Sequence, residues 1–404
     1  MDCEMVEGGK SVKVKGFRFS AVEAAVKKPG RLDLALILSE VPAAVAAVFT
    51  TNRVKAAPVL LSMQHAAGGV ARALVVNSGN ANACTGAQGM ADAAETARLV
   101  AEGCGIPEGM VLVASTGVIG KQLPMERIRA AIPPLVNAAA SRSMEEVARA
   151  IMTTDTFPKL ETRQGEAGGK SYSIAGVAKG SGMIMPNMAT MLSFLVTDAA
   201  VDPAFLDKAF RRAVDSSFNI ITVDGDTSTN DMASIMASGM AGNAPIREGS
   251  PEAADFESLL SGILLSLAKQ IVLDGEGATK LVGIHVRGAV NEADAKRAAM
   301  AVANSSLVKT AFFGQDANWG RILAAVGYSG AEIDQDRACL SFDDVLMVRD
   351  GIFVGGDAEA RGTEILKKRE FSVTIDLQLG SGNAVVFTSD LSHDYVTINA
   401  DYRT

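Results

Sequence analysis

The chain has 404 residues, of which 48% are hydrophobic and only 5% aromatic, and its 39 glycines follow no fixed period. This composition predicts a globular protein with a sizeable core and excludes a collagen-like or disordered chain. The formal net charge is −8, and no segment concentrates lysine and arginine beside aromatic residues, so nucleic acid is not an expected partner.

The first part of the chain predicts a cytoplasmic protein. Residues 1–17 carry several charges and lack the apolar run of a secretory signal. The apolar stretch Leu34–Phe49 contains Glu40 and Pro42 and is too short to span a bilayer, so no membrane association is expected.

The cysteines and histidines are too scattered to predict a disulfide framework or a metal site. No C-x-x-C pair occurs, which fits reduced thiols. The histidines are isolated and lack the spacing of metal ligands, so neither a metal nor a catalytic histidine is expected. These residues are Cys3, Cys84, Cys104, Cys339, His65, His285 and His393.

Two helices are predicted in the first 160 residues. Apolar residues recur at helical spacing from Met90 to Cys104, and Gly105 marks the end of this helix. Ser143 and Glu146 have the spacing of a capping box and start a second helix, which stops before Pro158.

Turns, a strand and further helices follow. Residues 164–169 predict a glycine-rich turn, and residues 191–197 predict a buried strand. Asp202 followed by Pro203 starts a helix, and residues 256–270 form another, with leucine and isoleucine on one face.

The last third of the chain predicts one more helix and an amphipathic strand. The helix starts near Asn291 and Asp294. In residues 371–378 apolar and polar side chains alternate, which is typical of a strand with one face in the core. Residues 242–251 predict an exposed loop.

These elements predict an α/β protein of the α+β class, with layered sheets. Single helices do not regularly separate the strands, so a doubly wound parallel sheet is disfavoured. We expect a catalytic sandwich in residues 1–280 and a smaller C-terminal α/β domain in residues 281–404.

The most informative segment is KGSGMIMPNMATML, residues 179–192. Its glycines and Pro186 predict a turned approach to the buried strand, so Thr190 lies where a turn enters a strand. That placement suits a nucleophile held on a rigid element, although a threonine at a strand start is more often structural.

This segment resembles the signature of the ornithine acetyltransferase family, whose self-processing resembles that of N-terminal nucleophile hydrolases. Further blocks in family order extend the resemblance over nearly the whole chain: AAVFTTNRVKAAPV, VVNSGNANACTG, ASTGVIG, TVDGDTSTND, DGEGATK, GQDANWGRILAA and the terminal NADYRT.

The resemblance implies an N-terminal-nucleophile-like sandwich that cuts itself between Ala189 and Thr190. The freed α-amine of Thr190 has a pKa near neutrality and can serve as the base without a histidine. Thr190 would carry the acetyl group from N-acetylornithine to glutamate in a ping-pong cycle. The two chains would assemble as α2β2, without a metal or organic cofactor, and acetyl-CoA stays open as a second donor.

The resemblance also assigns roles to site residues. Thr116 and Gly117, in a Ser-Thr-Gly turn, correspond to the oxyanion hole. The groups that bind the substrate correspond to Thr153, Lys179, Thr190, Glu276, Asn399 and Thr404. Asn399 and Thr404 lie near the end of the chain, and chain ends are usually mobile, so this segment needs an anchor. The apolar area of Tyr395, Val396, Ile398 and Tyr402 is expected to supply it.

Two segments and the fold also allow other interpretations. Residues 224–230 begin like a calcium loop but lack its later glycine and glutamate, so a strand-to-helix turn is expected there. The segment that contains Cys84 matches no phosphate-loop pattern, and no histidine is tied to it. Two function classes stay open as alternatives: a self-processing amidohydrolase or aminopeptidase of the same fold, and an uncut ligand-binding protein.

Overall fold

The computed structural model describes residues 13–139, 143–185 and 191–400, which form two compact units. The first unit comprises Met1–Gly180, Asn187–Phe218 and Thr227–Leu267, and the second comprises Ser181–Pro186, Asn219–Asp226 and Ala268–Thr404. The chain therefore passes between the units several times. The sequence-based division at residue 280 stays a prediction.

The described part of unit 1 is built on an eight-stranded sheet of order β4-β3-β2-β9-β7-β6-β5, with β1 paired to β2. Only β3–β4 and β7–β9 are parallel pairs. The strands are β1 (Phe17–Val22), β2 (Leu34–Phe49), β3 (Val70–Asn80), β4 (Val111–Val118), β5 (Lys159–Ala167), β6 (Lys170–Lys179), β7 (Leu192–Thr197) and β9 (Met232–Ala237).

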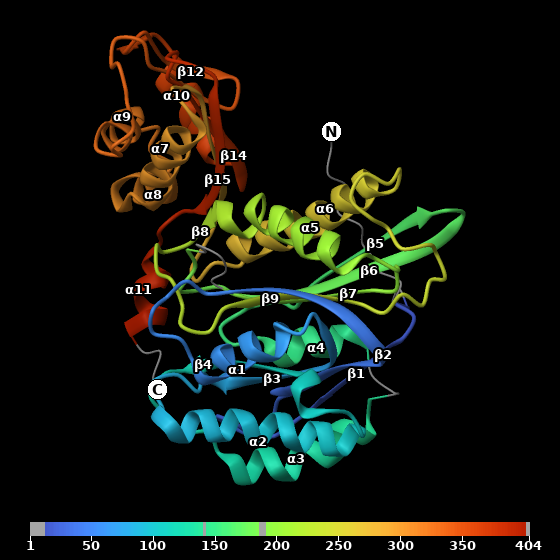
Figure 1. Ribbon diagram of the computed structural model, residues 1–404. Coiled ribbons are helices and arrows are strands. Elements are labelled where there is room, and N and C mark those ends of the chain that lie inside the picture. The colour runs from blue at the N-terminus through green and yellow to red at the C-terminus, as the bar shows by residue number, and fades with distance from the viewer. Residues whose placement is uncertain (1–12, 140–142, 186–190, 401–404) are drawn as a thin grey trace. The chain divides into compact units, whose positions relative to one another are not determined.

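Helices cover this sheet in layers (Figure 1). Helix α4 lies inside the fold, in contact with β1, β2 and β3 as well as with β5 and β6. Helices α1, α2 and α3 share a second core with the opposite face of β2, β3 and β4. The helices of this unit are α1 (Ala57–Ala66), α2 (Gly86–Cys104), α3 (Met125–Asn137), α4 (Met144–Ile151), α5 (Pro203–Asp215) and the first part of α6 (Ala253–Leu273).

Strand β2 explains the apolar run near the start of the chain. Ala35 and Ile37 face the core around α4, while Leu34 and Leu36 face the core around α1 to α3. A strand buried on both faces reads as a continuous apolar stretch rather than as an alternating one.

The predicted helix signals are confirmed. The backbone N–H of Ser143 donates to the Glu146 carboxylate at 3.1 Å, and Asp202 accepts from Ala204 and Phe205 N–H at 3.0 and 3.1 Å. Helix α2 ends at Gly105, whose φ of +64° closes the last turn.

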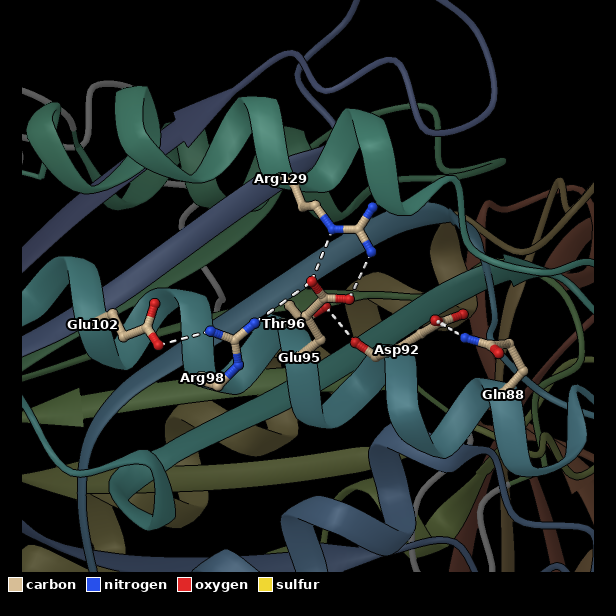
Figure 2. A network of polar contacts seen from close by, with 7 residues as sticks. All are labelled: Gln88, Asp92, Glu95, Thr96, Arg98, Glu102 and Arg129. Atoms are coloured by element: carbon tan, nitrogen blue, oxygen red, sulfur yellow. Dashed lines mark hydrogen bonds and ion pairs between the residues drawn. The ribbon is translucent and has the colours of Figure 1, made fainter.

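A polar network joins α2 to α3 on the surface (Figure 2). Both guanidinium nitrogens of Arg129 that face α2 donate to Glu95, at 2.8 and 2.9 Å. Arg98 lies 3.6 Å from the same carboxylate and bonds Glu102 at 2.7 Å. This two-pronged contact orients the helices, although exposed pairs add little stability.

The described part of unit 2 is built on a seven-stranded mixed sheet of order β13-β12-β11-β14-β10-β15-β8. Its strands are β8 (Ile221–Thr222), β10 (Leu281–Ala289), β11 (Cys339–Phe342), β12 (Val345–Arg349), β13 (Ile352–Phe353), β14 (Glu370–Asp376) and β15 (Gly382–Ser389). Its helices are α7 (Glu292–Asn304), α8 (Ser306–Phe313), α9 (Trp319–Gly327), α10 (Ala358–Leu366) and α11 (His393–Ala400). The alternation predicted for residues 371–378 is confirmed, since Phe371, Val373 and Ile375 are buried in β14.

Three expectations from the sequence are wrong in detail. Residues 224–230 lead into strand β9 and not into a helix. The turn in residues 164–169 is only Gly168–Gly169, both with positive φ, because β5 continues to Ala167. Val396 and Ile398, expected to anchor the tail, are 66% and 37% exposed.

The layered α+β class is confirmed, and the long apolar helix α6 is part of the core. Helix α6 is long and apolar enough to cross a membrane by length and composition alone. Within unit 1 its Phe256 ring packs 6.2 Å from Phe205 of α5, and Ile263 and Leu267 face Gly176 of β6. Packing against other elements therefore accounts for this hydropathy.

Unit 2 contains a buried amine with a lowered pKa. Lys309 of α8 is 4% exposed, and its Nζ donates to Thr388 Oγ1 at 2.9 Å and to the Ser389 carbonyl. Burial lowers the pKa of Lys309 to about 7, against the opposing effect of Asp390 and Asp224.

We predict that this lysine makes the protein more stable in mild base. The unfolded chain binds more protons than the folded one between pH 7 and the ordinary lysine pKa of about 10.4. The free energy of unfolding should therefore rise with pH in that window, by at most about 1.4 kcal/mol per pH unit. Urea titrations at pH 7 and pH 9 measure it, and an unchanged slope in Lys309→Met would contradict the assignment.

Candidate active site

The predicted nucleophile lies outside the described residues, as do Ala189 and Thr404. Thr190 directly precedes Met191, whose carbonyl accepts from the Met232 N–H at 3.1 Å. In the next row Leu192 pairs with Lys179 of β6 and with Met232 of β9. The described chain after Thr190 is therefore fixed within the sheet from its first residue.

The predicted oxyanion pair, Thr116 and Gly117, lies near the end of β4. Only glycine fits at position 117. Gly117 has a φ of +132°, and a Cβ on it would lie 2.3 Å from the Gly79 carbonyl carbon. Asn230 donates to the Ser115 carbonyl at 2.9 Å and so braces the strand just before Thr116. The Lys179 ammonium donates to Thr116 Oγ1 at 3.3 Å.

One buried carboxylate connects three of the predicted site segments. Asp155 Oδ1 accepts from Lys159 Nζ at 2.8 Å and from Gly180 N–H at 2.7 Å, and its Oδ2 accepts from Thr153 N–H at 2.9 Å. Unit 1 thus brings together Thr153, Lys179 and, through Lys179, Thr116.

The charges explain why Asp155 is ionised. Burial raises its pKa, but the ammonium groups of Lys179 and Lys159 together with the Gly180 N–H lower it to about 2. A buried carboxylate held by this many donors fixes backbone and side chains in one arrangement. Sequence analysis missed Asp155, whose only signal is its place in the polar run Thr153 to Thr156.

A second buried acid, Asp231, directly precedes β9, and its pKa is shifted in the opposite direction. Asp231 is 2% exposed, and its Oδ2 has no hydrogen-bond partner among the described residues. Burial raises its pKa well above the ordinary value, although Ser228, Lys179 and Thr50 lower it. Burial therefore favours the neutral form of Asp231, and sequence analysis gave no sign of this.

Unit 2 brings together the other two described site residues. Asn399 Nδ2, on α11, donates to Glu276 Oε2 at 2.8 Å. The Glu276 N–H donates to the Ser181 carbonyl at 2.8 Å, and a Cβ on Gly182 would lie 2.2 Å from Glu276 Oε2. Glycine at position 182 therefore allows the Glu276 side chain to approach the backbone.

A further acid, Asp224, binds the same segment. It accepts from Met183 N–H at 2.6 Å, from Ile184 N–H at 2.8 Å and from the Tyr395 hydroxyl at 3.2 Å. Burial raises the pKa of Tyr395, and the negative charge of Asp224 raises it further. The carboxylate that resembled a calcium ligand thus binds protein donors.

Comparison with known proteins gives matches over nearly the whole chain. The model of the ArgJ family matches residues 18–404. The arginine biosynthesis bifunctional protein ArgJ of Geobacter sulfurreducens is 70% identical over 393 residues, which cover 97% of this chain and 100% of that protein. The protein of the same name from Syntrophotalea carbinolica is 55% identical, with 97% and 100% covered.

Solved structures match with lower coverage of this chain. Arginine biosynthesis bifunctional protein argJ from Bacillus halodurans is 43% identical with a TM-score of 0.51, and the match covers 52% of this chain and 99% of that one. Ornithine acetyltransferase complexed with ornithine, from Mycobacterium tuberculosis, is 40% identical with a TM-score of 0.39, and the match covers 44% and 94%.

We predict that Gly117→Ala is far more costly than Gly120→Ala. Both glycines have positive φ, at +132° and +82°, but a Cβ meets backbone only at Gly117. Gly120→Ala should cost about 1 kcal/mol of unfolding free energy, and Gly117→Ala about 3 kcal/mol or more. Urea unfolding measures both, and equal costs would contradict the close approach.

We also predict that Asp155→Asn strongly destabilises the protein at neutral pH. The substitution removes the anion that faces two buried or nearly buried ammonium groups, at an expected cost of about 3 to 5 kcal/mol. The wild type should lose this contribution only as pH falls below about 4 toward 2, because the folded pKa of Asp155 is lowered. The exposed pair Glu145–Arg149 offers a control, since Glu145→Gln should change unfolding little.

Proposed function

The chain belongs to the ArgJ family of arginine-biosynthesis acyltransferases, and on that premise we propose that it transfers the acetyl group of N2-acetyl-L-ornithine to L-glutamate. The products are L-ornithine and N-acetyl-L-glutamate. The observation that carries the proposal is the family match over residues 18–404. The motif KGSGMIMPNMATML supplies a threonine as the acyl carrier.

The enzyme first cuts its own chain. The Thr190 hydroxyl adds to the Ala189 carbonyl carbon, the C–N bond breaks as an ester forms, and water hydrolyses the ester. Segment 1–189 then ends in a carboxylate, and Thr190 gains a free α-amine. The half-length match to the B. halodurans chain supports this, because residues 190–404 make up slightly more than half of this chain.

Transfer proceeds in two halves. The α-amine takes the proton of the Thr190 hydroxyl as its oxygen attacks the acetyl carbonyl, and the proton passes to the leaving amine of ornithine. The amine of glutamate then attacks the acetyl-Thr190 ester and regenerates the hydroxyl. Neither half requires a metal or an organic cofactor.

Unit 1 supplies the electrostatics of this reaction. Thr116 and Gly117 stabilise the oxyanion, and the close packing of Gly117 keeps that strand end rigid, as a preorganised site requires. Lys179, positioned between Asp155 and Thr116, offers a fixed positive charge for the substrate carboxylate, with Thr153 nearby. The 3.3 Å contact between Lys179 and Thr116 supports a shared role.

Glu276 and Asn399 are assigned to the amine end of the substrate. Glu276 is 8% exposed and carries an oxygen that accepts from Asn399, so the pair offers both an acceptor and a donor. Thr404, four residues beyond α11, completes the substrate-binding set in this proposal. The α and β chains form a cytoplasmic α2β2 assembly.

The word bifunctional in the names of the relatives supports a second donor for this chain as well. With acetyl-CoA the same acetyl-Thr190 ester would form by loss of a thiol rather than of ornithine. This reaction would provide net N-acetylglutamate instead of recycling the acetyl group.

Intact mass after expression tests the proposal. Wild type and the control Thr310→Ala, which changes an exposed threonine of α8, should give two fragments that meet at Ala189/Thr190. Thr190→Ala should stay whole, because it lacks the attacking oxygen. Incubation with N-acetylornithine should add an acetyl mass to the Thr190 fragment only.

Two outcomes would contradict it. A wild type that stays whole and unacetylated would favour a ligand-binding protein. Fragments that release acetate to water without forming N-acetylglutamate would favour a self-processing amidohydrolase.

A further inference from the structure

The segment Ser181–Met185, upstream of the proposed cut, is bound by its backbone to other segments of unit 2. The Val223 N–H donates to the Ile184 carbonyl at 2.7 Å, and Thr222 Oγ1 donates to the same oxygen at 3.2 Å. The Glu276 N–H donates to the Ser181 carbonyl at 2.8 Å. The segment is therefore held through the backbone carbonyls of Ser181 and Ile184.

Asp224 holds the one strained residue of this segment. Met183 has a φ of +57°, which costs a non-glycine residue energy, and its side chain is 43% exposed. Strained backbone persists only where its surroundings fix it. The Asp224 carboxylate does so by accepting two successive N–H groups, from Met183 and Ile184.

Helix α11 also binds both acids that contact this segment, Asp224 and Glu276. Tyr395 donates to Asp224, and Asn399 donates to Glu276. Each acid thus contacts the 181–185 segment and α11, which carries a residue of the proposed substrate site. Since α11 has no buried residue, these polar contacts are important for its position.

We propose that Asp224 is a positioning residue that fixes residues 183–184 for the cut and afterwards holds the 1–189 chain to the 190–404 chain. The inference rests on the self-cleavage proposed above. Before the cut, the two N–H groups and the carboxylate belong to one chain; after it, the same hydrogen bonds join two chains. One carboxylate would therefore serve both the precursor and the mature enzyme.

The test compares Asp224→Asn with Asp226→Asn. Asp226 is an exposed carboxylate two residues along the chain, so it is a matched control. An amide keeps one acceptor oxygen but presents an NH2 group where the second N–H points. Asp224→Asn should slow the appearance of the two fragments by about tenfold or more and lower the urea concentration at which the chains separate. Asp226→Asn should behave like wild type in both measurements.

The outcomes separate this inference from the proposed function. A wild type that is never cut overturns the proposed function, whereas a cut wild type matched by Asp224→Asn in cutting rate and chain separation overturns the inference. If Asp224→Asn lowers the unfolding midpoint but the folded variant is cut at the wild-type rate, Asp224 has only a structural role and the positioning role is overturned.

A second measurement does not use the Asp224 variant, which could fail to fold. Amide hydrogen exchange, followed by mass spectrometry of peptides from residues 181–185, should show protected amides in the intact Thr190→Ala chain and in the cut enzyme. Exchange of this segment at the rate of an unstructured peptide would overturn the proposal.

Discussion

The register of β7 is the constraint on which the rest of the site depends. This strand pairs antiparallel with β6 and parallel with β9, and its first residue, Leu192, lies in one row with Lys179 and Met232. Side chains alternate along a strand, so a slip by one residue would turn every side chain of β7 to the other face. Burial of the apolar side chains of Phe194 and Val196 makes that slip energetically unfavourable. It thereby fixes the register of the strand that begins two residues after Thr190.

Two buried acids near this row show how neighbours decide the charge of a carboxyl group. Asp155 has two lysines and backbone donors around it, which lower its pKa to about 2, whereas Asp231 has an oxygen with no hydrogen-bond partner among the described residues, and burial raises its pKa. The same burial penalty acts on both, and the number of favourable partners determines which form wins. Two carboxyl groups whose pKa values are shifted in opposite directions therefore both interact with the charge of Lys179.

Local signals in the sequence were sufficient for features stabilised locally. The caps at Ser143 and Asp202 and the alternation in β14 depend on residues a few positions apart, and the structure confirms them. The roles of Asp155 and Asp224 also depend on distant donors, such as the Gly180 N–H 25 positions away and the Tyr395 hydroxyl 171 positions away, which no local pattern encodes. The sequence wrongly predicts a helix after residues 224–230 for the same reason, because the strand that follows them, β9, is stabilised by its neighbours β2 and β7. The family resemblance assigned site residues that composition and periodicity could not.

The strand order of the first sheet has a consequence for biogenesis. Strands β9 and β7 separate β2 from β6, and both lie after residue 190. A polypeptide ending at residue 189 would therefore expose the unpaired edges of β2 and β6, which are templates for aggregation. Separate genes for the two halves would have to solve an assembly problem that a single precursor avoids, since its strands interleave before any bond is broken.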